Sequence, residues 1–144
     1  MRHRAALAAL LALLCCAAHA QAPALSAREA WVRATPGSDV AAAYVTLHNG
    51  GPQPIVIIGV RSARAAQAMI HESSIVGGQS RMRPRERLRI GAGETLRLAP
   101  GGLHVMLHGL TRALTAGEEV PLVLLLEGGA SVAVTARVRA LGED

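Results

Sequence analysis

The segment VPLVLLLEGGASVAVTARVRA, residues 120–140, is the clearest indication of the fold. Two runs of aliphatic residues flank a Gly-Gly pair at 128–129, which is the pattern of a β-hairpin. Apolar residues alternate with small or polar ones in the second run, so one face of that strand should be buried. That face carries Val132, Val134, Ala136 and Val138. The segment therefore predicts two antiparallel strands over a core.

Short apolar segments separated by Gly and Pro continue toward the N-terminus, and no stretch has the period of a long amphipathic helix. Tyr44 and Thr46 share one face of their segment, and Trp31 and Tyr44 are expected to be core residues. The alanine-rich piece 62–68 could form one helical turn. Strands are expected at 29–35, 41–49, 55–63 (buried on both faces), 67–74, 95–99 and 101–110. The predicted fold is all-β, a sandwich or barrel in one domain.

The N-terminus is predicted to be an export signal. Basic MRHR precedes an apolar run that is too short to span a bilayer comfortably, and AHA at 18–20 fits a small-x-small cleavage site. Cleavage after Ala20 would leave a mature domain of residues 21–144 that begins at Gln21. The expected location is the periplasm.

A lipoprotein signal is the alternative interpretation, because Cys15 and Cys16 lie near the end of the apolar run. Leu14 precedes Cys15 where a small residue would be expected, so cleavage after Ala20 is favoured. This cleavage removes both cysteines, and the mature domain must then be stable without a disulfide. Residues 21–144 contain no further apolar stretch long enough for an integral membrane segment.

The charge of the chain does not indicate nucleic-acid binding. The formal net charge is +5, and the loss of Arg2 and Arg4 with the signal lowers it to +3. RMRPRERLR, residues 81–89, is the densest basic stretch, but the chain has no Phe, one Tyr and one Trp, so few rings could stack on bases. A solvated strand or loop face explains this stretch better.

GGLHVMLHGL, residues 101–110, carries the chemistry. His104, Met106 and His108 occupy alternate positions of a predicted strand and should project from one face, while the other face is aliphatic. Imidazole and thioether ligands suit Cu(I), which is a soft cation. Methionine also binds without losing a proton and cannot form a disulfide in an oxidising compartment.

A longer pattern runs through the chain: His71, Met82, His104 and Met106 have the spacing H-x10-M-x21-H-x-M. This spacing resembles the motif of the periplasmic copper chaperones of the PCuAC family. The resemblance extends to AWVRATPG, AAAYVTLHN, HESS, SRMRP and GAGETLRLAPGGLHVML, in the family order, and covers about residues 28–138. It implies a cupredoxin-like β-sandwich in which these four residues bind one Cu(I) per chain.

Three other side chains are candidates for lesser roles. Met69 lies two residues before His71, so on a strand it shares that face and could shield the metal or replace a ligand. His108 stands where many family members have Met, and it could support a ligand, contribute to a secondary Cu(II) state or be solvated. His48 is expected to be structural or exposed.

The resemblance implies a soluble metal carrier, expected to be a monomer and not an enzyme. Its implied partner is the Cu(A) subunit of cytochrome c oxidase or another oxidase-assembly protein. A blue-copper electron carrier would require a cysteine thiolate, which the mature domain lacks. Two alternatives remain: a periplasmic protein that buffers copper without delivering it, and an adhesion or assembly module without a metal.

Overall fold

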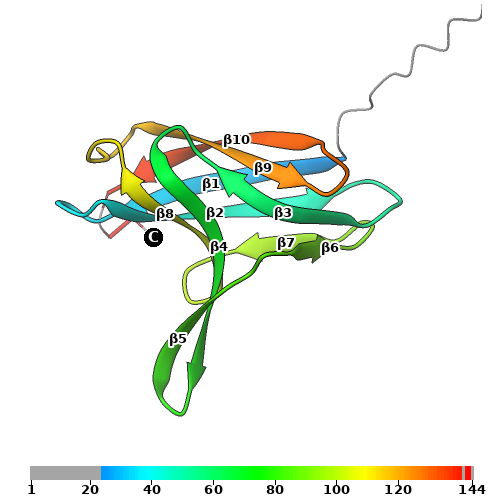
Figure 1. The fold of residues 1–144 in the computed structure, drawn as a ribbon, viewed down its shortest axis with the longest axis horizontal. Coiled ribbons are helices and arrows are strands. Elements are labelled where there is room, and N and C mark those ends of the chain that lie inside the picture. The colour runs from blue at the N-terminus through cyan, green and yellow to red at the C-terminus, as the bar shows by residue number, and fades with distance from the viewer. Residues whose placement is uncertain (1–23, 141, 144) are drawn as a thin grey trace, which may run out of the picture.

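The C-terminal hairpin forms where the sequence predicts it, as strands β9 and β10 of the computed structural model (Figure 1). The structure describes residues 24–140 and 142–143, so the predicted signal and its cleavage site lie outside the described residues. The ten strands are β1 (Leu25–Ala34), β2 (Val40–Asn49), β3 (Ile55–Arg61), β4 (Ala65–Val76), β5 (Gln79–Pro84), β6 (Leu88–Ile90), β7 (Thr95–Leu98), β8 (Leu103–Leu110), β9 (Glu119–Leu126) and β10 (Ser131–Arg139). None of the described residues forms a helix long and apolar enough to cross a membrane.

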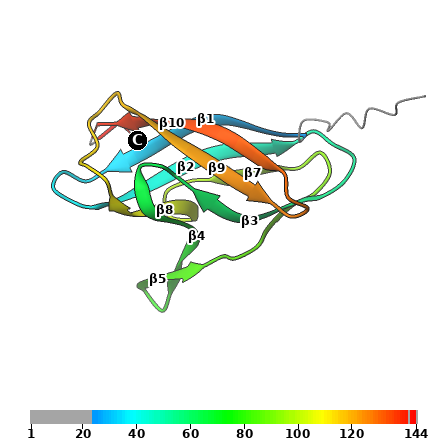
Figure 2. The same cartoon turned by 45° about the horizontal axis from the view of Figure 1, so that its top comes forward.

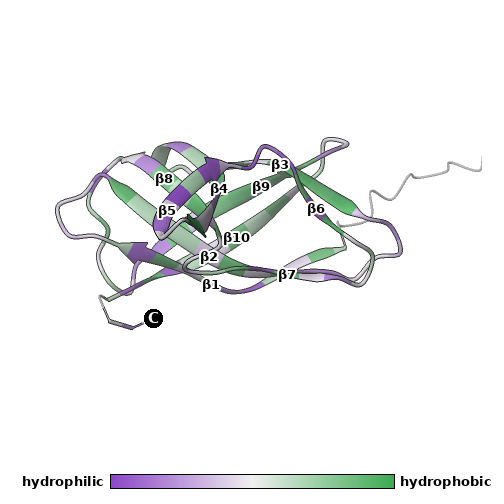
Figure 3. Ribbon diagram, turned by 90° about the horizontal axis from the view of Figure 1, so that it is seen from below, coloured by the Kyte–Doolittle hydropathy of each residue, from purple (hydrophilic) through white to green (hydrophobic). Residues whose placement is uncertain are grey.

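The strands form one continuous sheet with the order β5-β4-β8-β2-β1-β10-β9-β3-β6, and β7 pairs with the second half of β2. This sheet curls into two layers, which separate β1, β2 and β7 from β3, β4 and β6 in Figure 3. Buried side chains from both ends of the strand order form one hydrophobic cluster, including Ile57, Ile70, Val105 and Leu122. The predicted all-β sandwich is confirmed.

The β4–β5 hairpin extends away from this body in both Figure 1 and Figure 2. Its outer part is exposed: Ile75, two residues before the turn, has 73% of its surface accessible, and all of β5 is exposed. The arginine-rich segment 81–89 begins on β5, so its interpretation as a largely solvated face agrees with the structure. We call residues 73–84 the arm.

A β-bulge in β1 places the aromatic residues. The register of β1 against β2 shifts between Arg28 and Trp31, and Glu29 there has a left-handed φ of 54°. The extra residue changes which side chains of β1 face the core, as a bulge does. Trp31 then pairs with Tyr44 on the face opposite the main hydrophobic cluster, while Val32 points into it. Both rings are buried, as predicted.

Two local predictions were wrong. Residues 62–68 form no helical turn, because β4 begins at Ala65 and pairs with Leu110 of β8; strand pairing outweighs the helical preference of alanine there. The segment 55–63 is not buried on both faces. Ile57 and Val60 are buried, but Ile58 is 45% exposed at an irregularity in the pairing with β9.

Candidate metal centre

The candidate metal centre is built on the pairing of β4 with β8. His71 lies directly opposite His104, and Met69 lies directly opposite Met106. Directly opposed residues of antiparallel strands project to the same side, with Cβ atoms about 4.5–5.5 Å apart. The other parity of both strands, with Ile70 and Val105, faces the hydrophobic cluster. Two imidazoles and two thioethers therefore occupy one patch of the outer face.

His104 is the most fixed of these side chains. It is buried, and its Nδ1 lies 2.9 Å from the backbone oxygen of Gly102. A carbonyl oxygen only accepts hydrogen bonds, so Nδ1 carries the proton and donates it, which leaves the Nε2 lone pair available to a metal. The centroid of the Tyr44 ring lies 6.4 Å from that of the His104 ring, and Tyr44 packs against Trp31 in a tilted arrangement with 4.5 Å between centroids. The hydrogen bond to Gly102 and the neighbouring Tyr44 ring both restrict the orientation of the imidazole.

His71 has a ring nitrogen without a hydrogen-bond partner. Its Nδ1 is buried and makes no hydrogen bond in the described structure. Burial, followed by repulsion from His104 and His108, lowers the pKa of His71. The ring is therefore neutral at neutral pH, which is the form that binds metals. A bound metal ion would satisfy the Nδ1 atom, which otherwise costs desolvation energy.

Met82 lies on β5, the strand on the other side of β4 from β8. It pairs with Ser73 of β4, two residues beyond His71, so it lies diagonally across from His71 on the same face. Diagonal neighbours have Cα atoms about 7–8 Å apart, which a methionine side chain can span. Met82 is 51% exposed on the arm. His71 lies on β4, in agreement with the strand predicted at 67–74, and Met82 lies on β5, the other strand of the same hairpin.

His108 lies on the same face but farther along β8, opposite Gln67. Its ring centroid is 6.4 Å from that of His71, and the His71 and His104 rings are 6.0 Å apart. The His108 Nε2 is buried without a hydrogen-bond partner in the described structure. Among residues 24–140 and 142–143, no three His, Cys, Asp or Glu side chains are grouped so that they could hold a metal ion.

This arrangement suits a soft monovalent cation. Neutral imidazoles and thioethers are ligands that Cu(I) accepts, whereas Mg²⁺ and Ca²⁺ require oxygen ligands. The His71 Nδ1 atom has no hydrogen-bond partner, and the hydrogen bond from His104 Nδ1 to Gly102 leaves the His104 Nε2 unprotonated, so the adjacent strands offer two nitrogen atoms suited to such a cation. The sequence did not indicate that Trp31 and Tyr44 lie beside His104, because the bulge at Glu29 determines which face of β1 carries the Trp31 side chain.

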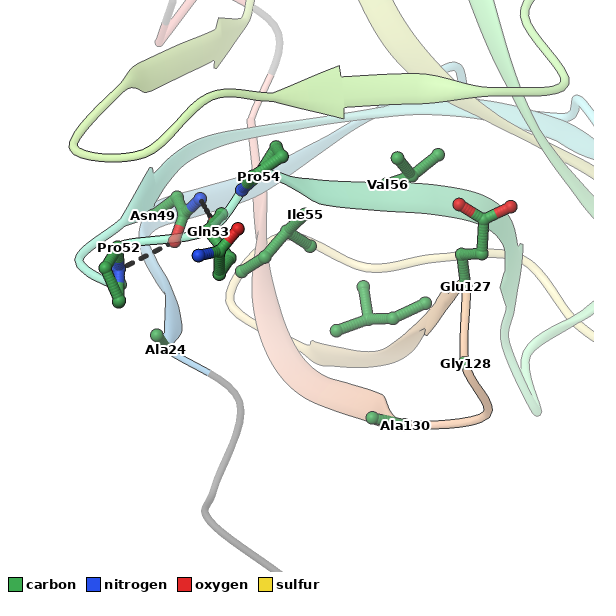
Figure 4. A pocket seen from close by; sticks show the side chains of 12 residues that line it. Ala24, Asn49, Pro52, Gln53, Pro54, Ile55, Val56, Glu127, Gly128 and Ala130 are labelled. Atoms are coloured by element: carbon green, nitrogen blue, oxygen red, sulfur yellow. Dashed lines mark hydrogen bonds between the residues drawn. The ribbon is translucent and has the colours of Figure 1, made fainter.

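A separate hollow at the start of β1 does not resemble a metal site (Figure 4). Its buried polar side chain is Asn49, whose amide nitrogen donates hydrogen bonds to the backbone oxygens of Gln53 at 2.8 Å and Gly91 at 3.0 Å. The Asn49 side-chain oxygen accepts a hydrogen bond from the Gly51 amide at 3.0 Å. These bonds hold the loop after β2, so Asn49 is structural. His48 is structural too, since its Nδ1 lies 3.0 Å from the Thr95 hydroxyl.

Comparison with known proteins assigns this chain to a family. Residues 25–138 match the family described as "Putative lipoprotein LpqE-like". A relative from Leifsonia xyli subsp. xyli, "Putative lipoprotein Lxx21020", is 34% identical over 142 residues, which cover 92% of this chain and 85% of the relative.

Solved structures have the same fold. The solution structure of apo-DR1885 from Deinococcus radiodurans is 37% identical in sequence and has a TM-score of 0.65. The match covers 86% of this chain and 84% of the DR1885 chain. The Cu(I) form of DR1885 is 36% identical, with coverage of 88% and 85% and a TM-score of 0.65. The copper-bound PCuAC domain from PmoF2, at 24% identity, a TM-score of 0.67 and coverage of 81% and 93%, supports the fold alone. The chain therefore belongs to the LpqE-like family, a family of PCuAC-type domains.

Proposed function

We propose that this protein is an exported copper carrier that binds one Cu(I) through His71, Met82, His104 and Met106. The observation that carries the proposal is the direct pairing of His71 with His104, with Met106 two residues further along the same face. Met82 approaches the same face from the neighbouring strand. The Cu(I)-bound structure of DR1885, at 36% identity, supports the choice of metal.

The arrangement favours a carrier over a permanent cofactor site. Thioethers bind Cu(I) less tightly than thiolates do, and one of the two, Met82, lies on an exposed arm. A ligand that a partner protein can reach allows copper to be passed on by ligand exchange. Cu(II) would be a secondary state, since its preference for nitrogen would leave the thioethers weakly used.

We further propose that the protein works outside the cytoplasm, in the periplasm, after cleavage behind Ala20. The apolar N-terminal segment with AHA at 18–20 is the basis for this. The relatives whose descriptions include the word lipoprotein are consistent with export.

The proposed recipient is the Cu(A) subunit of cytochrome c oxidase or another protein of oxidase assembly, and the carrier acts as a monomer. The alternative is a protein that buffers copper without a dedicated recipient, because the same ligands would serve both roles. The two differ in kinetics. A delivery protein transfers copper to the apo Cu(A) domain faster than copper dissociates into solution, whereas a buffer transfers it at the dissociation rate.

The deciding experiment has two stages. Anaerobic titration with Cu(I) against the chromophoric chelator bicinchoninate should give one copper per chain. A protein that binds none would overturn the copper proposal and favour the alternative of an assembly module without a metal. The copper-loaded protein is then mixed with apo Cu(A) domain at increasing concentrations. A transfer rate that rises with the acceptor concentration supports delivery, and a constant rate supports buffering.

A further inference from the structure

The patch contains one more sulfur than the proposed four-residue set uses. Met69 lies directly opposite Met106 in the β4–β8 pairing and shares its face with His71. It is 38% exposed and points away from the hydrophobic cluster that Ile70, its neighbour in sequence, helps to form. A large apolar side chain that is left on an outer face, two residues from a donor imidazole, needs an explanation.

The strand register places Met69 at least as close to the other proposed ligands as Met82. Met69 and Met106 are directly opposed, with an expected Cβ separation of about 4.5–5.5 Å, whereas Met82 is diagonal to His71 at about 7–8 Å between Cα atoms. Met69 also lies on β4 where it is paired with β8, and both strands belong to the body of the sheet. Met82 lies on the edge strand β5, at 51% exposure.

We propose that Met69 is an alternative sulfur ligand that takes the position of Met82 when the arm moves away. This inference rests on the proposed function. His71, His104 and Met106 then form three donors fixed by the β4–β8 pairing, and the two remaining thioethers share a fourth position. The exchange conserves the charge and coordination number of Cu(I): one Cu–S bond breaks as another forms, and no proton or electron moves.

The exchange gives the site a hand-over mechanism. When Met69 takes the fourth position, Met82 is released, and the exposed face of the arm opens to an incoming ligand from a partner. The copper remains bound by two imidazoles and two thioethers throughout. A site with only Met82 would become three-coordinate at the same step.

Met69 also borders a surface groove between β3 and β4, together with Ile58 and Arg87. Packing in this groove is the competing explanation for the side chain. The two roles differ in their dependence on Met82, because packing does not depend on which ligand holds the copper. Redundant ligands, in contrast, mask each other's loss.

The test is a double-mutant cycle on Cu(I) affinity, measured anaerobically by bicinchoninate competition with Met69→Leu, Met82→Leu and the double variant. Leucine keeps the volume and apolarity of methionine but cannot bind copper. We expect a loss of about threefold or less for Met69→Leu, about tenfold for Met82→Leu and about a hundredfold or more for the double variant, which exceeds the product of the single losses. Ile58→Ala, which disturbs the groove without removing sulfur, should add nothing to Met82→Leu.

X-ray absorption on the Cu(I) forms provides a second readout. Met82→Leu should retain two sulfur neighbours, and the double variant should retain one. Purely multiplicative losses, or a single sulfur neighbour already in Met82→Leu, would overturn the inference about Met69. Failure of the proposed function would look different: the wild type would bind no stoichiometric Cu(I), or Met106→Leu would keep the wild-type affinity.

Discussion

Single residues of the patch differ in how firmly the fold holds them, and this determines the cost of losing each thioether. Met106 is half-buried on β8, between Ala42 of β2 and Met69 of β4. We expect Met106→Leu to fold normally, because the exchange conserves volume, and to lower Cu(I) affinity by at least about tenfold, or about 1.4 kcal/mol. Met82→Leu should lower it by no more than about tenfold, because Met69 can take the place of Met82. Chelator competition measures both, and circular dichroism verifies the fold; wild-type affinity in both variants would contradict the site.

His108 provides a test of what lies outside the ligand set. We expect His108→Ala to keep one Cu(I) per chain, because the proposed ligands are complete without it. Repulsion from His108 contributes to the lowered pKa of His71, so its removal should raise the pKa of His71 toward its ordinary value. Copper titration and an NMR pH titration of the copper-free protein measure the two effects.

The matched control for this variant is His48→Ala, since His48 bonds Thr95 and has no ring contact with His71 in the described structure. It should leave both the stoichiometry and the His71 titration unchanged. A His108→Ala protein that loses stoichiometric Cu(I) binding would make His108 a ligand.

At the level of elements, the turn of the arm controls the position of Met82. Gly77 and Gly78 have φ values of 58° and 75°, and they connect the last pair of the hairpin, Val76 and Gln79. Two left-handed residues in a two-residue loop form a type I′ turn, which accepts Gly or Asn at its first position. Gly77→Val should therefore strain the arm by about 1–3 kcal/mol, whereas Gly77→Asn should be tolerated.

We expect Gly77→Val to weaken Cu(I) binding about as much as Met82→Leu does, because the loosened arm no longer presents Met82. The midpoint of global unfolding should change little, since the outer arm contributes no residue to the hydrophobic cluster. Hydrogen exchange of the β5 amides measures the loosening. Equal Cu(I) affinities for the Val and Asn variants would show that the arm does not help to bind the metal.

The predictions of strands were correct where they depended on neighbouring residues in the sequence. The 120–140 hairpin and the alternation of His104, Met106 and His108 depend on neighbouring residues, and both are found in the structure. The register that sets His71 opposite His104 joins strands distant in the sequence, and periodicity does not encode it. The same limit explains the error at 62–68, where alanine's helical preference could not show that β8 would pair with Ala65.

For the whole molecule, the N-terminus determines whether copper is carried freely or at a membrane surface. We expect the exported protein to begin at Gln21 without lipid, because AHA fits a signal peptidase site and Leu14 disfavours lipidation of Cys15. Intact-mass measurement after expression with export decides this. A mass that corresponds to a lipidated Cys15 or Cys16 would contradict the prediction and tether the carrier, as the word lipoprotein in the relatives' descriptions suggests for them.

The stability of the whole domain should depend on its core and its metal, and not on a cross-link. Removal of residues 1–20 leaves no cysteine, so the denaturant midpoint should be the same with and without a reductant. Cu(I) should raise the free energy of unfolding by mass action, about 2.7 kcal/mol at a free concentration one hundred times the dissociation constant, because only the folded chain brings β4, β5 and β8 together. At the same free Cu(I) concentration, the free energy of unfolding of Met106→Leu should rise by less, and the difference should match its loss of Cu(I) binding free energy. Unfolding followed by circular dichroism with buffered Cu(I) measures this, and a midpoint that does not respond to excess Cu(I) would show that the folded patch does not bind copper.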